Sequence, residues 1–80
     1  MRIRSLFFAT YRDMAGSDEL AVELPAGARV QDLVLRLRAR NGLGAMPETP
    51  VVAVNMTYAP LSTELRDGDE VAFIPPVAGG

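Results

Sequence analysis

The 80-residue sequence contains no cysteine and no histidine, and all eight of its basic residues are arginine. Without cysteine and histidine the chain has no disulfides, no thiol nucleophile, no imidazole acid–base catalyst and no zinc site built on these ligands. Without lysine it has neither Schiff-base chemistry nor a lysine amine for self-conjugation. We therefore expect any reactivity to reside in the backbone terminus or in a partner protein.

Charge and hydropathy exclude further classes of protein. The net charge is −2 and the pI is about 4.9, so the basic stripe typical of nucleic-acid binding is missing. No apolar run approaches the ~18–20 residues that cross a bilayer. The opening "MRIRSLFFATYRD" lacks the apolar core and cleavage site of a signal peptide. The sequence predicts a single cytoplasmic domain over residues 1–80, with no nucleic-acid or membrane partner.

Four short segments combine β-branched or aromatic residues with partial alternation, which is typical of half-buried strands. The predicted strands are residues 2–9, 19–24, 51–56 and 70–74. The link over residues 10–18 contains Gly16, Ser17 and Asp18, a turn cluster, so we expect the first two strands to pair antiparallel. Residues 57–65 are predicted to be irregular. The Asp-Gly-Asp sequence at 67–69 is interpreted as a tight turn and not as a metal site.

One helical pattern begins near Val30 and ends near Asn41 and Gly42, with an apolar stripe every three to four residues. The element order β-β-α-β-β predicts an α+β fold, a mixed sheet with one helix packed across one face. The predicted core residues are Ile3, Phe7, Leu20, Val22, Val30, Leu33, Leu37, Val52, Val54, Val71 and Phe73.

A single helix covers only one face of a sheet, so the other face needs an explanation. Alternation places Leu6, Phe8, Ala72 and Ile74 on that second face, with Tyr58 nearby. A soluble monomer rarely exposes a contiguous apolar patch. Either loops cover this patch, or it binds a partner protein beside the C-terminus; we favour partner binding.

The C-terminal segment, residues 75–80, is predicted to be an extended tail. Its residues are Pro75, Pro76, Val77, Ala78, Gly79 and Gly80. The two prolines fix φ and end the pairing of the last strand. The two glycines have no Cβ and fit a narrow channel. A frayed terminus is the alternative, since most chain ends are poorly ordered.

The segment "LRDGDEVAFIPPVAGG" resembles the C-terminal signature of the molybdopterin synthase small subunit family, the MoaD-type sulfur carriers of the ubiquitin-like β-grasp superfamily. The segments "FFATYRDMAG" and "VVAVN" also resemble this family, so the likeness extends over the whole chain. One departure is Arg29, which stands where similar proteins often carry a capping Ser or Thr. We expect Asp32 to support the helix start instead.

The resemblance implies a reaction at the tail. A ubiquitin-activating-type adenylyltransferase would consume ATP, form a transient AMP adduct on Gly80 and allow its conversion to a thiocarboxylate. The sulfur would then pass to cyclic pyranopterin monophosphate, held by the synthase large subunit, to form the dithiolene of molybdopterin. The resemblance implies a heterotetramer of two small and two large subunits, no permanently bound cofactor and no metal.

Catalytic side chains are expected on the large subunit, and Gly79 is expected to thread its channel. The residues predicted to touch partner proteins are Phe8, Tyr58, Ile74, Pro75, Pro76, Val77 and Ala78. Three alternatives stay open at this point. The chain is a sulfur carrier for thiamine synthesis, a ubiquitin-like modifier that forms isopeptides through Gly80, or an interaction module with an inert tail.

Overall fold

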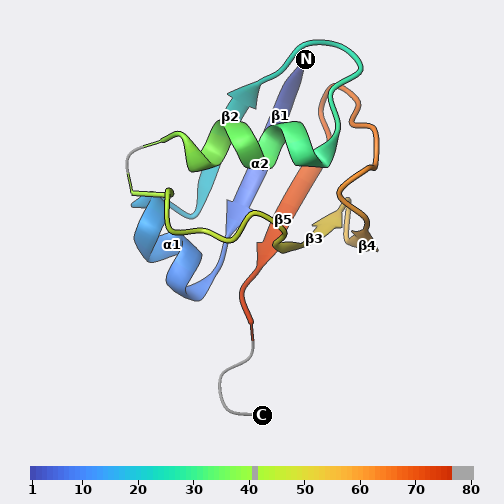
Figure 1. Ribbon diagram of the computed structural model, residues 1–80. Coiled ribbons are helices and arrows are strands. Elements are labelled where there is room, and N and C mark those ends of the chain that lie inside the picture. Colours follow the sequence, from blue (N-terminus) through green and yellow to red (C-terminus); the bar gives the residue numbers. More distant parts are fainter. Residues whose placement is uncertain (41, 77–80) are drawn as a thin grey trace.

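The computed structural model describes residues 1–40 and 42–76, and in them a five-stranded mixed sheet carries two helices. The elements are β1 (Arg2–Phe7), α1 (Ala9–Ala15), β2 (Glu19–Glu23), α2 (Val30–Arg38), β3 (Val51–Val54), β4 (Thr57–Ala59) and β5 (Glu70–Ile74). The strand order is β2-β1-β5-β3-β4, with β1 and β5 parallel and the other pairs antiparallel. Helix α2 lies across one face (Figure 1), as predicted for an α+β fold.

Helix α1 is an addition to the predicted order, because the link over residues 10–18 was predicted without a helix. The turn predicted at Gly16, Ser17 and Asp18 and the antiparallel pairing of β1 with β2 are confirmed. The first strand ends at Phe7, and α1 occupies Ala9–Ala15. The helix buries only Tyr11, so it shows no apolar stripe that a sequence pattern detects. It ends at Gly16, whose φ of 72° is left-handed and whose N–H donates to the carbonyl of Arg12.

Strand β4 is the second addition, because residues 57–65 were predicted to be irregular. The predicted third strand, 51–56, ends at Val54, and a two-residue turn of Asn55 and Met56 leads into β4. Both turn residues have positive φ, 48° and 72°, which a tight hairpin of this type requires. Glycine is the usual second residue of such a turn, so Met56 gave no signal for it.

The core lies between the sheet and α2. The rings of Phe7 and Phe73 stack there with centroids 5.5 Å apart. Every predicted core residue is buried except Leu20 and Val54, which are partly buried and pack against the core. The core also includes residues outside the predicted list. These are Tyr11, Leu24, Ala28, Val34, Leu43, Met46 and Leu65.

The start of α2 agrees with the prediction for Asp32. Its carboxylate accepts a hydrogen bond from the Arg29 N–H at 2.7 Å. The Arg29 guanidinium donates to the Ser62 carbonyl at 2.7 Å and so ties the helix start to the loop before β5. Helix α2 ends at Arg38, earlier than predicted, and Asn41 lies outside the described residues. Neither helix has the length and apolar character that crossing a bilayer requires, within the residues described.

Candidate functional site

The face of the sheet opposite α2 is apolar toward the end where β5 finishes. Strand register aligns Leu6 with Ala72, Ala72 with Ala53, and Ala53 with Tyr58 in one row across four strands. A second row pairs Val51 with Ile74. Since side chains alternate between faces, both rows point away from α2. We call this surface, with Phe8, the apolar half; its residues are Leu6, Phe8, Val51, Ala53, Tyr58, Ala72 and Ile74.

Phe8 belongs to the apolar half although it follows the last residue of β1. Its φ of −121° and ψ of 151° are extended, so the alternation of β1 continues for one more residue. Phe7 aligns with Phe73, which places Phe8 beside Ile74. The exposed fractions are 48% for Phe8 and 74% for Tyr58. Contiguous exposure of such side chains is typical of a protein-binding surface.

The root of the tail lies at the edge of the apolar half. Pro75 is half-buried and Pro76 is exposed. A hollow of about 350 Å³ lies beside them. Tyr11 lines this hollow, and burial raises the pKa of its phenol. The lining residues are Tyr11, Pro47, Thr49, Pro50, Val51, Ile74, Pro75 and Pro76.

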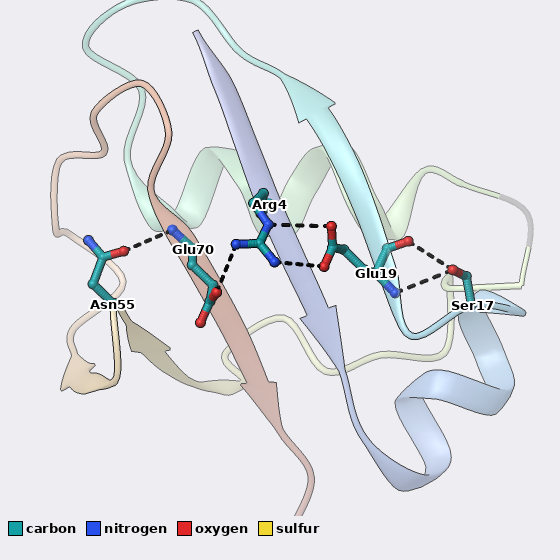
Figure 2. Close-up of polar contacts among 5 residues, drawn as sticks. All are labelled: Arg4, Ser17, Glu19, Asn55 and Glu70. Atoms are coloured by element: carbon teal, nitrogen blue, oxygen red, sulfur yellow. Dashed lines mark hydrogen bonds and ion pairs between the residues drawn. The ribbon is translucent and has the colours of Figure 1, made fainter.

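The face opposite α2, which we call the open face, carries charged side chains at its other end, and Arg4 links them. Its guanidinium contacts Glu19 through two hydrogen bonds, of 2.9 and 3.3 Å, and Glu70 through one of 3.2 Å. The Ser17 hydroxyl donates to the Glu19 carbonyl, and Asn55 accepts from the Glu70 N–H. Figure 2 shows this network on the side of the sheet away from α2. Hydrogen bonding and charge from Arg4 lower the pKa of Glu19, and Glu19 in turn raises the pKa of Arg4.

The structure brings only some of the predicted site residues together. It brings Phe8, Ile74 and Pro75 to one end of the sheet, whereas Tyr58 lies at the edge on β4, with β5 and β3 between it and β1. The sequence patterns missed Val51 and the loop residues Pro47 and Pro50. Their signal was the proline-rich "MPETP", which predicted only a loop. Four tail residues lie outside the described residues: Val77, Ala78, Gly79 and Gly80.

The model of the ThiS family matches residues 5–80. The chain belongs to the ThiS family. It is 43% identical over 83 residues to the molybdopterin synthase sulfur carrier subunit of Chlamydomonas reinhardtii, with 100% of each chain covered. It is 38% identical to the subunit of the same name from Escherichia coli strain K12, covering 98% of this chain and 99% of the relative. These relatives confirm the resemblance predicted from "LRDGDEVAFIPPVAGG".

Solved structures confirm the ubiquitin-like β-grasp fold of this ThiS-family chain. The putative subunit 1 of molybdopterin converting factor from Pyrococcus furiosus has a TM-score of 0.84 and 37% identity, covering 96% of this chain and 99% of that one. The archaeal modifier SAMP1 from Haloferax volcanii has a TM-score of 0.85 and 27% identity, with both chains fully covered. A Helicobacter pylori complex of subunits 1 and 2 of molybdopterin-converting factor gives 0.74 and 25% over both full chains.

Proposed function

We propose that this chain is the sulfur-carrier subunit of a molybdopterin synthase and that Gly80 is its reacting residue. The observation that best supports the proposal is that the apolar half and the tail are continuous along the chain. Strand β5 passes through Ile74 of the apolar half directly into Pro75 and Pro76, and the sequence then ends in two glycines. Relatives of matching length named molybdopterin synthase sulfur carrier subunit support the choice of pathway.

The first proposed step activates the carboxylate of Gly80. A carboxylate is a poor electrophile, because its negative charge opposes a nucleophile and oxide is a bad leaving group. A ubiquitin-activating-type adenylyltransferase joins it to AMP from ATP and releases pyrophosphate. A sulfur donor at the sulfide level then attacks the acyl carbon and displaces AMP, leaving a thiocarboxylate. In this scheme AMP is bound only transiently, and the use of ATP favours the cytoplasm as the compartment.

The second proposed step transfers the sulfur. The thiocarboxylate sulfur attacks a side-chain carbon of cyclic pyranopterin monophosphate held by the large subunit, and a carbon–oxygen bond at that carbon breaks, its oxygen leaving as water or with the phosphate. Water then cleaves the acyl–sulfur bond, which leaves sulfur on the pterin and returns the Gly80 carboxylate. A dithiolene contains two sulfur atoms, so each product consumes two thiocarboxylates; the proposed assembly is a heterotetramer of two small and two large subunits. The large subunit supplies the catalytic side chains, because this chain has no cysteine, histidine or lysine.

The composition of the tail suits insertion into a partner. Pro75 and Pro76 restrict the free tail and so lower the entropy lost when it is bound. Val77 and Ala78 are small enough for a channel wall. A methyl group at position 80 would stand beside the reacting carbon, which Gly80 avoids.

The apolar half is the proposed docking surface for both partners. Its exposed aromatic residues, Phe8 and Tyr58, belong to the class that is enriched at the cores of protein interfaces. Its border with Pro75 places the start of the tail next to the docked surface. The large subunit and the activating enzyme would then compete for one surface, and the carrier would leave one before binding the other.

Intact mass spectrometry of the chain from cells that make molybdenum cofactor tests the proposal. We expect a fraction in which one terminal oxygen is replaced by sulfur, localised to Gly80 by fragmentation. We also expect the cognate large subunit, and not a thiazole synthase, to copurify. A terminus that stays unmodified after incubation with ATP, the activating enzyme and a sulfide donor would exclude a carrier function.

Protein modification is a second candidate, supported by the likeness to the archaeal modifier SAMP1. In that case activated Gly80 forms an isopeptide with a lysine of a target protein. Higher-mass conjugates in lysate that disappear when Gly79 and Gly80 are deleted would identify a modifier. Their absence, together with a thiocarboxylate on Gly80, would leave the sulfur carrier alone.

A further inference from the structure

Ala9 has an unusual backbone conformation. In the described part of the chain, three residues other than glycine have positive φ: Ala9 at 49°, Asn55 at 48° and Met56 at 72°. Asn55 and Met56 form the β3–β4 hairpin turn, whose geometry demands positive φ at both positions. No hairpin explains Ala9, which follows Phe8 and opens α1. An alanine pays a steric cost in this region that glycine does not pay, and such costs cluster at functional sites.

The conformation of Ala9 lies at a sharp change of direction. Phe7 points into the core and is 2% exposed, Phe8 points to the open face, and Tyr11 is back in the core at 3% exposed. The Phe7 N–H donates to the Asp18 carbonyl at 2.8 Å, which holds the end of β1. Ala9 therefore joins a strand and a helix that are both anchored in the core.

The backbone of Phe8 is held on the helix side of the junction. Its carbonyl accepts hydrogen bonds from the N–H groups of Tyr11 at 3.0 Å and Arg12 at 3.4 Å. Its side chain, by contrast, is half exposed. The direction of that side chain consequently depends on the backbone of Phe8 and Ala9 more than on packing around the ring.

We propose that Ala9 is a positioning residue that fixes Phe8 for partner binding; this inference rests on the proposed docking role of the apolar half. The anchored strand and helix hold Ala9 at positive φ, where its Cβ leaves only the small left-handed region accessible. Glycine populates both signs of φ, so it would let Phe8 sample more orientations. In Ala9→Gly, the Phe8 side chain would have to be ordered on binding, and this cost would weaken affinity for the large subunit roughly 2- to 10-fold.

Three variants of the full chain test this inference by titration calorimetry with the cognate large subunit. Ala9→Gly removes the confinement and is expected to weaken binding while unfolding at the same or a higher urea concentration. D-alanine at position 9, introduced by chemical synthesis, prefers positive φ and is expected to restore wild-type affinity. Met56→Gly relieves the same kind of backbone cost at the β3–β4 hairpin, whose strands lie two and three positions from β1 in the sheet, and is expected to leave affinity unchanged.

Phe8→Ala distinguishes a failure of the docking role of the apolar half from a failure of the role of Ala9. If Phe8→Ala binds the large subunit as the wild type does, the docking role of the apolar half is wrong and the inference about Ala9 falls with it. If Phe8→Ala binds weakly but Ala9→Gly binds normally, only the inference about Ala9 is overturned. Weak binding by Ala9→Gly that D-alanine fails to restore also overturns it, because conformation is then not the cause.

Discussion

Phe7 and Phe8 are the same residue type at adjacent positions, yet they lie on opposite faces of one sheet. Phe7 is 2% exposed and stacks on Phe73, whereas Phe8 is 48% exposed on the apolar half. The covered face gains stability from apolar area removed from water on folding. The open face leaves apolar area in water, and that area is recovered only when a partner covers it. One strand therefore carries one set of residues that stabilises the fold and another set that, in the proposed function, binds a partner.

The largest expected effect comes from breaking the covered face. Phe7→Ala removes a stacked ring and leaves a cavity in the core, which costs about 3–5 kcal/mol of the free energy of unfolding. A domain of this size has a total stability of the order of 5–15 kcal/mol, so the loss is a large fraction of it. Urea denaturation followed by circular dichroism measures the shift. A midpoint equal to that of the wild type would mean that Phe7 is not a core residue.

The next largest effect is expected on the open face, where a substitution changes affinity for the partner more than it changes stability. Phe8→Ala is expected to change the free energy of unfolding by less than about 1 kcal/mol, because the ring is half exposed. It is expected to weaken binding of the large subunit by about 2 kcal/mol or more, or roughly 30-fold. Calorimetric titration and urea denaturation measure the two quantities on the same sample.

Leu35→Ala is the matched control for Phe8→Ala. Leu35 is 65% exposed on the side of α2 turned away from the sheet, so it is an exposed apolar residue outside the apolar half. Its replacement is expected to leave both affinity and stability close to the wild type. Equal weakening by Leu35→Ala and Phe8→Ala would show that the partner does not distinguish the two faces.

The same alternation explains how much the sequence predicts. Strands β1 and β5 alternate over several residues, so both the core residue Phe73 and the surface residue Ile74 were assigned correctly. Helix α1 and strand β4 are short, and neither shows a period that local patterns detect. Their positions are set by distant contacts, such as the burial of Tyr11 and the pairing of β4 with β3. The hollow beside Pro75 escaped prediction for the same reason, since α1 and a loop form its wall.

A smaller effect is expected at a polar position on the covered face. Ser5 is fully buried, and its hydroxyl makes no hydrogen bond with any described residue. Burying an unsatisfied hydroxyl costs free energy, so Ser5→Ala is expected to raise the free energy of unfolding by about 1 kcal/mol. Ser17→Ala is the control, because the Ser17 hydroxyl bonds to Glu19 and its loss is not expected to stabilise. A clear loss of stability in Ser5→Ala would reveal a partner for the hydroxyl.

The smallest effect belongs to the charged end of the open face. Arg4 lowers the pKa of Glu19 in the folded state. The pairing of ionised Glu19 with Arg4 therefore contributes to stability above the ordinary pKa of a glutamate, and this contribution is lost as pH falls through the pKa of Glu19 in the folded protein. Arg4→Gln is expected to raise the pKa of Glu19 toward its ordinary value, measured by NMR titration of the side-chain carboxyl carbon. Salt is expected to act in the same direction, since the pair is exposed.

Arg2→Gln controls for the loss of charge alone. It removes a positive charge two residues away on β1, where the register partner is Glu23 instead of Ala21. We expect a much smaller change at Glu19, because the direct hydrogen bonds from Arg4 remain. Equal shifts in the two variants would mean that the net charge of the face, and not the geometry of Arg4, controls Glu19. The charged end would then lack the fixed arrangement that separates it from the apolar half.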